Sequence, residues 1–131
     1  MDSGDPSDAL AGVDAIEADR LVDHMAARLR RFGTRHWREN AGDAGGTAAD
    51  AVHELVLWCA RLDAEIDPER PADVPVDPPR PAYAAALADQ LAVVGRDLAI
   101  AVGERGDPAI AEEVLTTLRR YARALRIEPK D

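Results

Sequence analysis

The sequence contains a single cysteine and no apolar run long enough to cross a membrane. Cys59 therefore cannot form an intrachain disulfide, and nothing indicates an oxidising compartment. Residues 1–7 include two aspartates and no basic residue, a composition that argues against a secretory leader. From these absences we expect a cytoplasmic protein without a membrane partner.

Aromatic side chains are also scarce, at 4% of the residues, although hydrophobic residues make up 47%. Much of the hydrophobic fraction is alanine, which favours helix and fills little space, so Leu, Val and Ile must build most of the core. No stretch shows the sustained two-residue alternation of a strand. Because 131 residues is the usual length of one domain, we expect a single all-α domain.

The first half of the chain predicts two long helices. Apolar residues spaced by threes and fours, apart from the step from Val13 to Leu21, indicate a helix over residues 8–32. Residues 34–40 either form a short separate helix or continue the first. Thr47, followed three residues later by Asp50, resembles a capping box and begins a helix that reaches about Ile66. The predicted buried stripes are Leu10, Val13, Leu21, Met25, Leu29 and Phe32 in the first helix, and Val52, Leu55, Cys59, Leu62 and Ile66 in the second.

The second half predicts another two helices. Pro81 suits the first turn of a helix over residues 81–104. Asp107 is a natural N-cap, and Pro108 suits the first position of a helix over residues 108–126. The predicted stripes are Tyr83, Leu87, Leu91, Val94, Leu98 and Val102, and then Ile110, Val114, Leu118, Tyr121 and Leu125.

Residues 67–81 read DPERPADVPVDPPRP and hold six of the nine prolines, so they can be neither helix nor central strand. At about 3.1 Å per residue the segment covers about 40 Å, more than the roughly 30 Å length of a 20-residue helix. We therefore predict an antiparallel four-helix bundle in up-down-down-up order, with this connector as the crossover between helices 2 and 3. The domain spans residues 8–127 in this interpretation, between flexible tails at 1–7 and 128–131.

The histidines form no recognisable catalytic set. The residues after His24 and His53 lack the lysine and glycine that follow a phosphotransfer histidine. On a helical wheel His53 lies roughly 140° from its helix's apolar stripe, so we expect it to face solvent, away from the buried, inert Cys59. The glycines within residues 42–46 lack the lysine of a P-loop. The sequence thus predicts no catalytic residue, no metal site and no cofactor.

The segment from Thr47 to Glu65, TAADAVHELVLWCARLDAE, resembles the second helix of DinB-type bundles and the related mycothiol-dependent isomerases. In that family a histidine at such a position is one of three histidine ligands of a metal. The resemblance therefore implies the role of a metal ligand for His53. The family's other ligands lie on the last long helix, where residues 109–126 contain no histidine. The resemblance therefore implies a small-molecule or metal-binding bundle whose metal site has degenerated.

The formal net charge of −9 makes nucleic acid an unlikely partner, because like charges repel at long range. Arginines nevertheless cluster late in the first and last helices, where cations complement the helix dipole. In the up-down-down-up order both clusters reach the same end of the bundle. This arrangement predicts an anion-binding pole formed by Arg28, Arg31, Arg35, Arg119, Arg123 and Arg126.

Apolar residues also occur on the predicted outer faces of the second and third helices. Such strips are often buried against another subunit, so we expect a homodimer whose interface contains Leu57, Val93 and Ile100. The leading hypothesis is a non-enzymatic helical protein–protein interaction or regulatory module, whose partner is another protein or a second copy. The DinB-like small-molecule or metal-binding bundle is the alternative.

Overall fold

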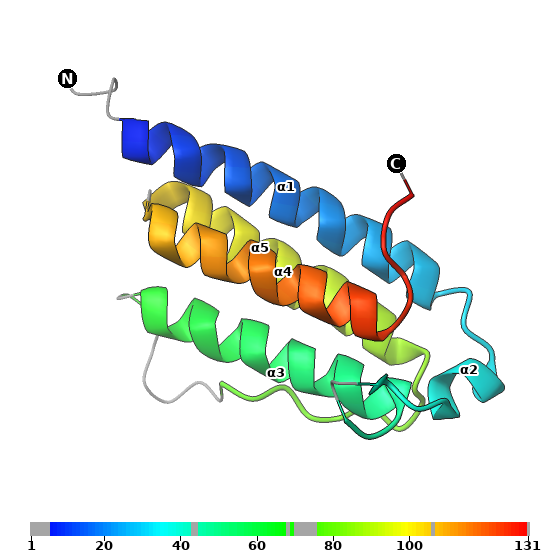
Figure 1. The fold of residues 1–131 in the computed structure, drawn as a ribbon. Coiled ribbons are helices and arrows are strands. Elements are labelled where there is room, and N and C mark those ends of the chain that lie inside the picture. The colour runs from blue at the N-terminus through cyan, green and yellow to red at the C-terminus, as the bar shows by residue number, and fades with distance from the viewer. Residues whose placement is uncertain (1–5, 43–44, 68, 70–75, 106, 131) are drawn as a thin grey trace.

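The computed structural model describes residues 6–42, 45–67, 69, 76–105 and 107–130, and side chains from Ala11 onward. The helices are α1 (Pro6–Leu29), α2 (Thr34–Arg38), α3 (Ala48–Ile66), α4 (Ala86–Arg105) and α5 (Pro108–Ala124) (Figure 1). No strand occurs in these ranges, only an isolated bridge between Asn40 and Thr47, so the predicted all-α class is confirmed. Among these helices none is long and apolar enough to span a bilayer.

The four long helices lie side by side, with α1 and α5 running in one direction and α3 and α4 in the other (Figure 1). Along α1 and α5, ion-paired Glu17 and Arg119 are followed by hydrogen-bonded His24 and Ile127, which agrees with parallel helices. Helices α1 and α4 are antiparallel. Val22 of α1 faces Gly95 of α4, whereas Arg30, later in α1, pairs with Asp89, which is earlier in α4. Helix α1 therefore contacts α4 on one side and α5 on the other.

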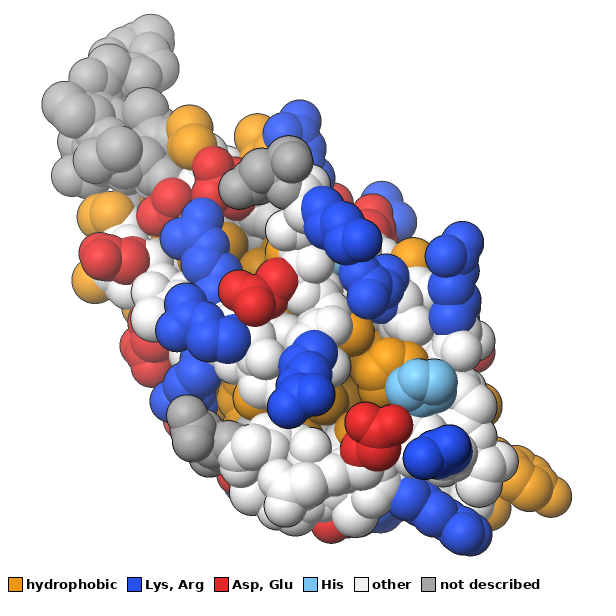
Figure 2. Space-filling model, turned by 45° about the vertical axis from the view of Figure 1, so that its right-hand side comes forward, with side chains coloured by type: hydrophobic (Ala, Val, Ile, Leu, Met, Phe, Trp, Pro, Cys, Tyr) orange, Lys and Arg blue, Asp and Glu red, His pale blue; other side chains and the backbone are white. Residues whose placement is uncertain are grey.

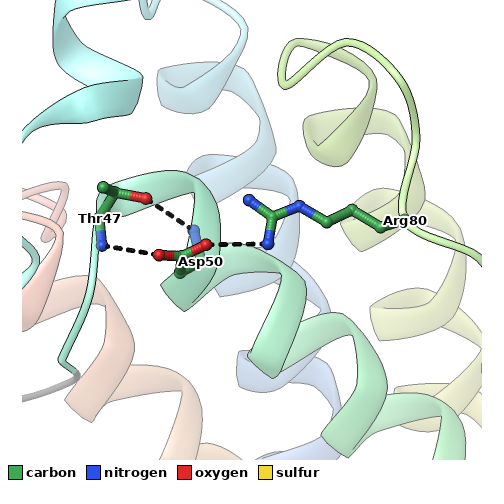
Figure 3. Close-up of polar contacts among 3 residues, drawn as sticks. All are labelled: Thr47, Asp50 and Arg80. Atoms are coloured by element: carbon green, nitrogen blue, oxygen red, sulfur yellow. Dashed lines mark hydrogen bonds and ion pairs between the residues drawn. The ribbon is translucent and has the colours of Figure 1, made fainter.

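Helix starts follow the side-chain signals in the sequence. Thr47 Oγ1 accepts a hydrogen bond from the backbone N–H of Asp50 at 3.2 Å, and the Asp50 carboxylate accepts one from the Thr47 N–H at 3.1 Å. This reciprocal pair is the predicted capping box, and it is confirmed (Figure 3). Asp107 caps α5 through the N–H groups of Ala109 and Ile110, as predicted.

The predicted bounds were wrong at two helices. Helix α1 begins at Pro6 and ends at Leu29, and α2 is a separate short helix. Val13, expected in the buried stripe, is 55% exposed, because the buried face of α1 follows Ala11, Ala15, Ala18 and Val22. Helix α4 begins at Ala86, not at residue 81. The residues before it form a turn whose hydrogen bonds join each N–H to the carbonyl three residues earlier. Tyr83 lies in this turn and is 79% exposed.

The core is one cluster of buried side chains drawn from all five helices. Alanine supplies many of its members, which lets the helices pack closely. Cys59 lies inside the cluster, where burial raises the pKa of its thiol to about 12, so the inert interpretation of this cysteine is supported. Five members of the predicted stripes pack against the cluster only partly buried: Phe32, Leu62, Ile66, Val94 and Ile110. Most of the other predicted members are buried, among them Leu55, Cys59, Leu87, Leu91, Leu98, Val114, Leu118 and Leu125.

The proline-rich connector returns along α3 toward the start of α4 (Figure 1). Arg61 of α3 forms a two-bond ion pair with Asp77 at 2.8 Å, and the Arg80 guanidinium lies 2.8 Å from Asp50 at the start of α3 (Figure 3). From α4, the side-chain amide of Gln90 donates to the carbonyl oxygen of Pro79 at 2.9 Å. Residues 77–80 therefore contact both α3 and α4. Residues 68 and 70–75 lie outside the described part of the chain.

These contacts also lower the pKa of two carboxyl groups, one on α3 and one in the connector. The Thr47 backbone N–H, followed by Arg80, holds the pKa of Asp50 below its usual value. Arg61 does the same for Asp77. All these side chains are exposed, so the ion pairs define the path of the connector more than they contribute to stability.

Candidate anion-binding face

A groove of about 640 Å³ runs between α1 and α5. Its floor is apolar, because Leu21, Leu115 and Ala122 are buried with only their edges accessible. Its rim is polar and mostly basic. We name it the α1–α5 groove, lined by Glu17, Arg20, Leu21, His24, Leu115, Arg119, Ala122, Arg123, Glu128 and Pro129.

The charges on this rim do not balance. Arg119 Nη2 lies 3.1 Å from Glu17 Oε2, and Arg123 Nε lies 3.8 Å from Glu128 Oε2. Both pairs are exposed, and such pairs typically contribute less than about 1 kcal/mol, so each arginine can exchange its partner for another carboxylate. Arg20 adds a third cation against two acids. The face drawn in Figure 2 carries many Lys and Arg side chains, with Asp and Glu among them, around apolar atoms.

A second hollow, of about 540 Å³, lies where α1 and α5 end. Arg28 comes from the last turn of α1, His36 from α2, and Arg126 from the turn after α5. The ring of Phe32 lies 5.2 Å from that of His36 and helps to hold the imidazole. We name this hollow the pole pocket, lined by Arg28, Phe32, His36, Glu39, Asn40, Ala41, Ala48, Ala124, Leu125 and Arg126.

Arg126 adopts an unusual backbone conformation, with φ at 59°. Its N–H donates to the carbonyl of Arg123 at 3.1 Å, and the next N–H, of Ile127, donates to the carbonyl of Ala122 at 2.9 Å. These are the two bonds of a Schellman motif, whose left-handed position is usually glycine. A side chain there costs roughly 1–2 kcal/mol, so the chain carries arginine at a position where glycine is the more stable choice.

The Schellman turn sends the chain back against α1. Ile127 is buried, and its carbonyl oxygen accepts a hydrogen bond from His24 Nε2 at 3.1 Å. Because a carbonyl oxygen only accepts, Nε2 of His24 carries the proton. The turn therefore places Ile127 against α1 and leaves Arg126 at the rim of the pole pocket.

The structure distributes the six predicted pole arginines over neighbouring hollows. Arg119 and Arg123 line the α1–α5 groove, while Arg28 and Arg126 share the pole pocket. Arg31 lines a further hollow of about 660 Å³ with Arg28, His24, Phe32, His36 and Lys130. Arg35 lies apart from these, beside Arg38 on α2.

Sequence reasoning missed several basic residues of this face. Arg20 and His24 precede the predicted Arg28 on α1 at intervals of four residues, so all three share one side of the helix, and this spacing could have indicated the two that were missed. His36 and Lys130 join them only because the chain turns at the ends of α1 and α5. No periodicity in the sequence indicates that second group.

The predicted dimer face is not one continuous surface. Val93 and Ile100, at 61% and 49% exposure, share the outer side of α4. Leu57 is half-buried and lies on the side of α3 that carries Asp50 and Arg61, over which the connector runs. The connector thus lies between the two parts of the face, and the homodimer stays a prediction.

His53 does not face open solvent as predicted. His53 is half-buried, and its Nδ1 atom is inaccessible and has no hydrogen-bond partner. The connector passes over this side of α3 and brings Asp77 near enough to interact electrostatically with the His53 ring. In the described ranges no group of three His, Cys, Asp or Glu side chains converges as metal ligands would. Within the described residues, the structure therefore places no further metal ligands beside His53 of the kind that the resemblance to DinB-type bundles would require.

No family model, no curated protein and no solved structure matches this chain in comparisons of sequence and fold. The function has to be inferred from the α1–α5 groove, the pole pocket and the charges around them.

Proposed function

We propose that this chain is a four-helix bundle of up-down-down-up order, one domain over residues 8–127, that acts as a non-enzymatic interaction module. Its partner is an acidic segment of another protein, which binds along the α1–α5 groove. The observation that carries the proposal is the combination of an apolar floor with an arginine-rich rim on a chain of net charge −9.

The groove suits a peptide with both apolar and acidic side chains. Leu21 and Leu115 offer an apolar floor on which a leucine-sized side chain can lose its contact with water. Arg20, Arg119 and Arg123 stand beside that floor, and guanidinium groups bind carboxylates through paired hydrogen bonds. The acidic remainder of the protein repels the same peptide, which restricts binding to this face.

A labelled synthetic peptide tests the proposal. We use a fluorescent peptide with leucines at helical spacing among glutamates, and measure its anisotropy on titration with the protein. The double variant Arg119→Gln, Arg123→Gln is expected to bind about tenfold more weakly, equivalent to about 1.4 kcal/mol, because two charge-assisted contacts are lost. Added salt should weaken binding to the wild-type protein in the same assay.

The matched control is Arg96→Gln, Arg105→Gln, which removes the same charge from exposed positions on α4. This variant should bind the peptide within about twofold of the wild-type protein, since neither arginine lines the groove. Equal weakening in both double variants means that only overall charge matters, and the groove proposal then fails. A peptide with lysines in place of glutamates should not bind.

A further inference from the structure

We propose that the pole pocket binds a phosphate monoester group, with Arg28 and Arg126 as the paired guanidinium donors. This site is separate from the α1–α5 groove, because the two hollows have no lining residue in common. The inference therefore goes beyond the proposed peptide partner. It can hold or fail on its own.

The first argument is convergence from separate parts of the chain. Arg28 is half-buried at the end of α1, Arg126 follows α5, and exposed His36 comes from α2. The side-chain amide of Asn40 also lines the pocket, and Glu39 is the one acid among its lining residues. Arg31 and Lys130 line the neighbouring hollow that shares Arg28 and His36.

The second argument is the backbone of Arg126. Arginines inside the last turns of α1 and α5 are explained by the helix dipole, but Arg126 lies beyond the end of α5 at the left-handed position of the Schellman motif. Glycine suits that position better, and a strained non-glycine residue is a reason to look for a function of its side chain. Arg126 and Arg28 both line the pocket.

The dipoles at this end of the molecule do not oppose an anion. Helices α1 and α5 end here, but α3 and α4 begin here (Figure 1). Two partial negative ends and two partial positive ends cancel to a first approximation, so the side-chain charges decide the sign of the local potential. They are mostly positive.

The chemistry favours phosphate over carboxylate. A phosphate monoester carries between about 1.5 and 2 negative charges near pH 7 and offers three acceptor oxygens. Two guanidinium forks can each donate two hydrogen bonds to such a group, and its larger charge and third acceptor oxygen make the attraction stronger than that of a carboxylate. The group can belong to a phosphorylated side chain of a partner or to a free phosphate ester, since the contacts are the same.

The variant Arg126→Gly gives the sharpest test, because stability and binding should change in opposite directions. Without ligand, its denaturation midpoint should be higher than that of the wild-type protein, as glycine relieves the left-handed strain. Its affinity for O-phosphoserine and for inorganic phosphate, measured by titration calorimetry and by amide shifts at fixed ionic strength, should fall at least about tenfold. Arg126→Lys should retain part of the affinity, because it keeps the charge but loses the fork.

Arg38→Gln is the matched control, since it removes one charge at the same end of the molecule but outside the pocket. It should leave phosphate affinity within about twofold. Tighter binding of a phosphoserine peptide than of O-phosphoserine or inorganic phosphate identifies a protein-borne group, and equal binding identifies a free ester. The proposal is overturned if acetate binds as well as phosphate, or if Arg126→Gly binds phosphate like the wild-type protein. A failed groove experiment with intact phosphate binding would reject the peptide partner alone.

Discussion

Replacement of Leu91 by alanine is expected to lower the free energy of unfolding by roughly 2–5 kcal/mol, a large share of the roughly 5–15 kcal/mol typical of a domain. Leu91 is fully buried on α4, in the cluster that joins all five helices. Truncation removes apolar contact area and leaves a cavity that helices held by their neighbours cannot close. Denaturant unfolding followed by circular dichroism measures the loss.

The control lies two residues away on the same helix. Val93 is 61% exposed, so Val93→Ala should change the free energy of unfolding by no more than about 0.5 kcal/mol. Leu118→Ala on α5 should behave like Leu91→Ala, since Leu118 is buried in the same cluster. Similar effects at Leu91 and Val93 would contradict the helical phase of α4 in this structure.

A second large effect is expected at Gly95, where α1 and α4 approach most closely among the glycine positions of α4. A Cβ atom on Gly95 would lie 2.8 Å from both Cγ atoms of Val22. Valine is branched at Cβ and buried here, so it cannot swing aside. Gly95→Ala should therefore cost about 1–3 kcal/mol of overpacking, which outweighs the gain of up to about 1 kcal/mol in helix propensity.

Gly12 provides the comparison, because it is also a helical glycine and a Cβ there meets no atom within 4 Å. Gly12→Ala should stabilise the protein by about 0.5–1 kcal/mol. In a Val22→Ala background, Gly95→Ala should cease to be destabilising, since the clash is gone. Thermal or denaturant unfolding of the four variants measures these differences, and equal stabilisation by Gly12→Ala and Gly95→Ala is the result that would rule out the close α1–α4 contact.

Local signals in the sequence predicted much of the secondary structure. The reciprocal bonds of Thr47 and Asp50, and the cap at Asp107 followed by Pro108, depend on residues within one helical turn, and both are present. The spacing of leucines in α4 and α5 also identified Leu87, Leu91, Leu98 and Leu118 as buried. It missed the buried Leu115, and Val94 and Ile110 of the same stripes are only partly buried. Such features could be predicted because the residues that determine them are neighbours in sequence.

The errors came from contacts between distant segments. His53 is half-buried because the connector returns over α3, which helical periodicity cannot indicate. Tyr83 lies in a turn before α4, where alanine-rich sequence looked equally helical. The left-handed conformation of Arg126 was also not predicted, because glycine and not arginine is typical of such a position. Only Pro129, shortly after the end of α5, indicates that the helix ends nearby.

The candidate site was predicted only as a cluster of charges. The helical order brought the late arginines of the first and last helices to one end, but their division into a groove and a pocket depends on the turns at residues 30–33 and 125–127. These turns place His36 and Arg126 beside Arg28. Composition alone suggested an acidic protein that repels anions, whereas the α1–α5 groove and the pole pocket are lined by more basic than acidic side chains.

The most direct test of the central claim is to map where the acidic leucine-containing peptide binds. Titration of the isotope-labelled protein with this peptide, followed by amide chemical shifts, should perturb residues of α1 and α5 around Leu21 and Ala122, at the floor of the α1–α5 groove. The perturbations should disappear in Arg119→Gln, Arg123→Gln. Perturbations centred on Val93 and Ile100 of α4, or no change at peptide concentrations at which anisotropy reports binding, would contradict the account.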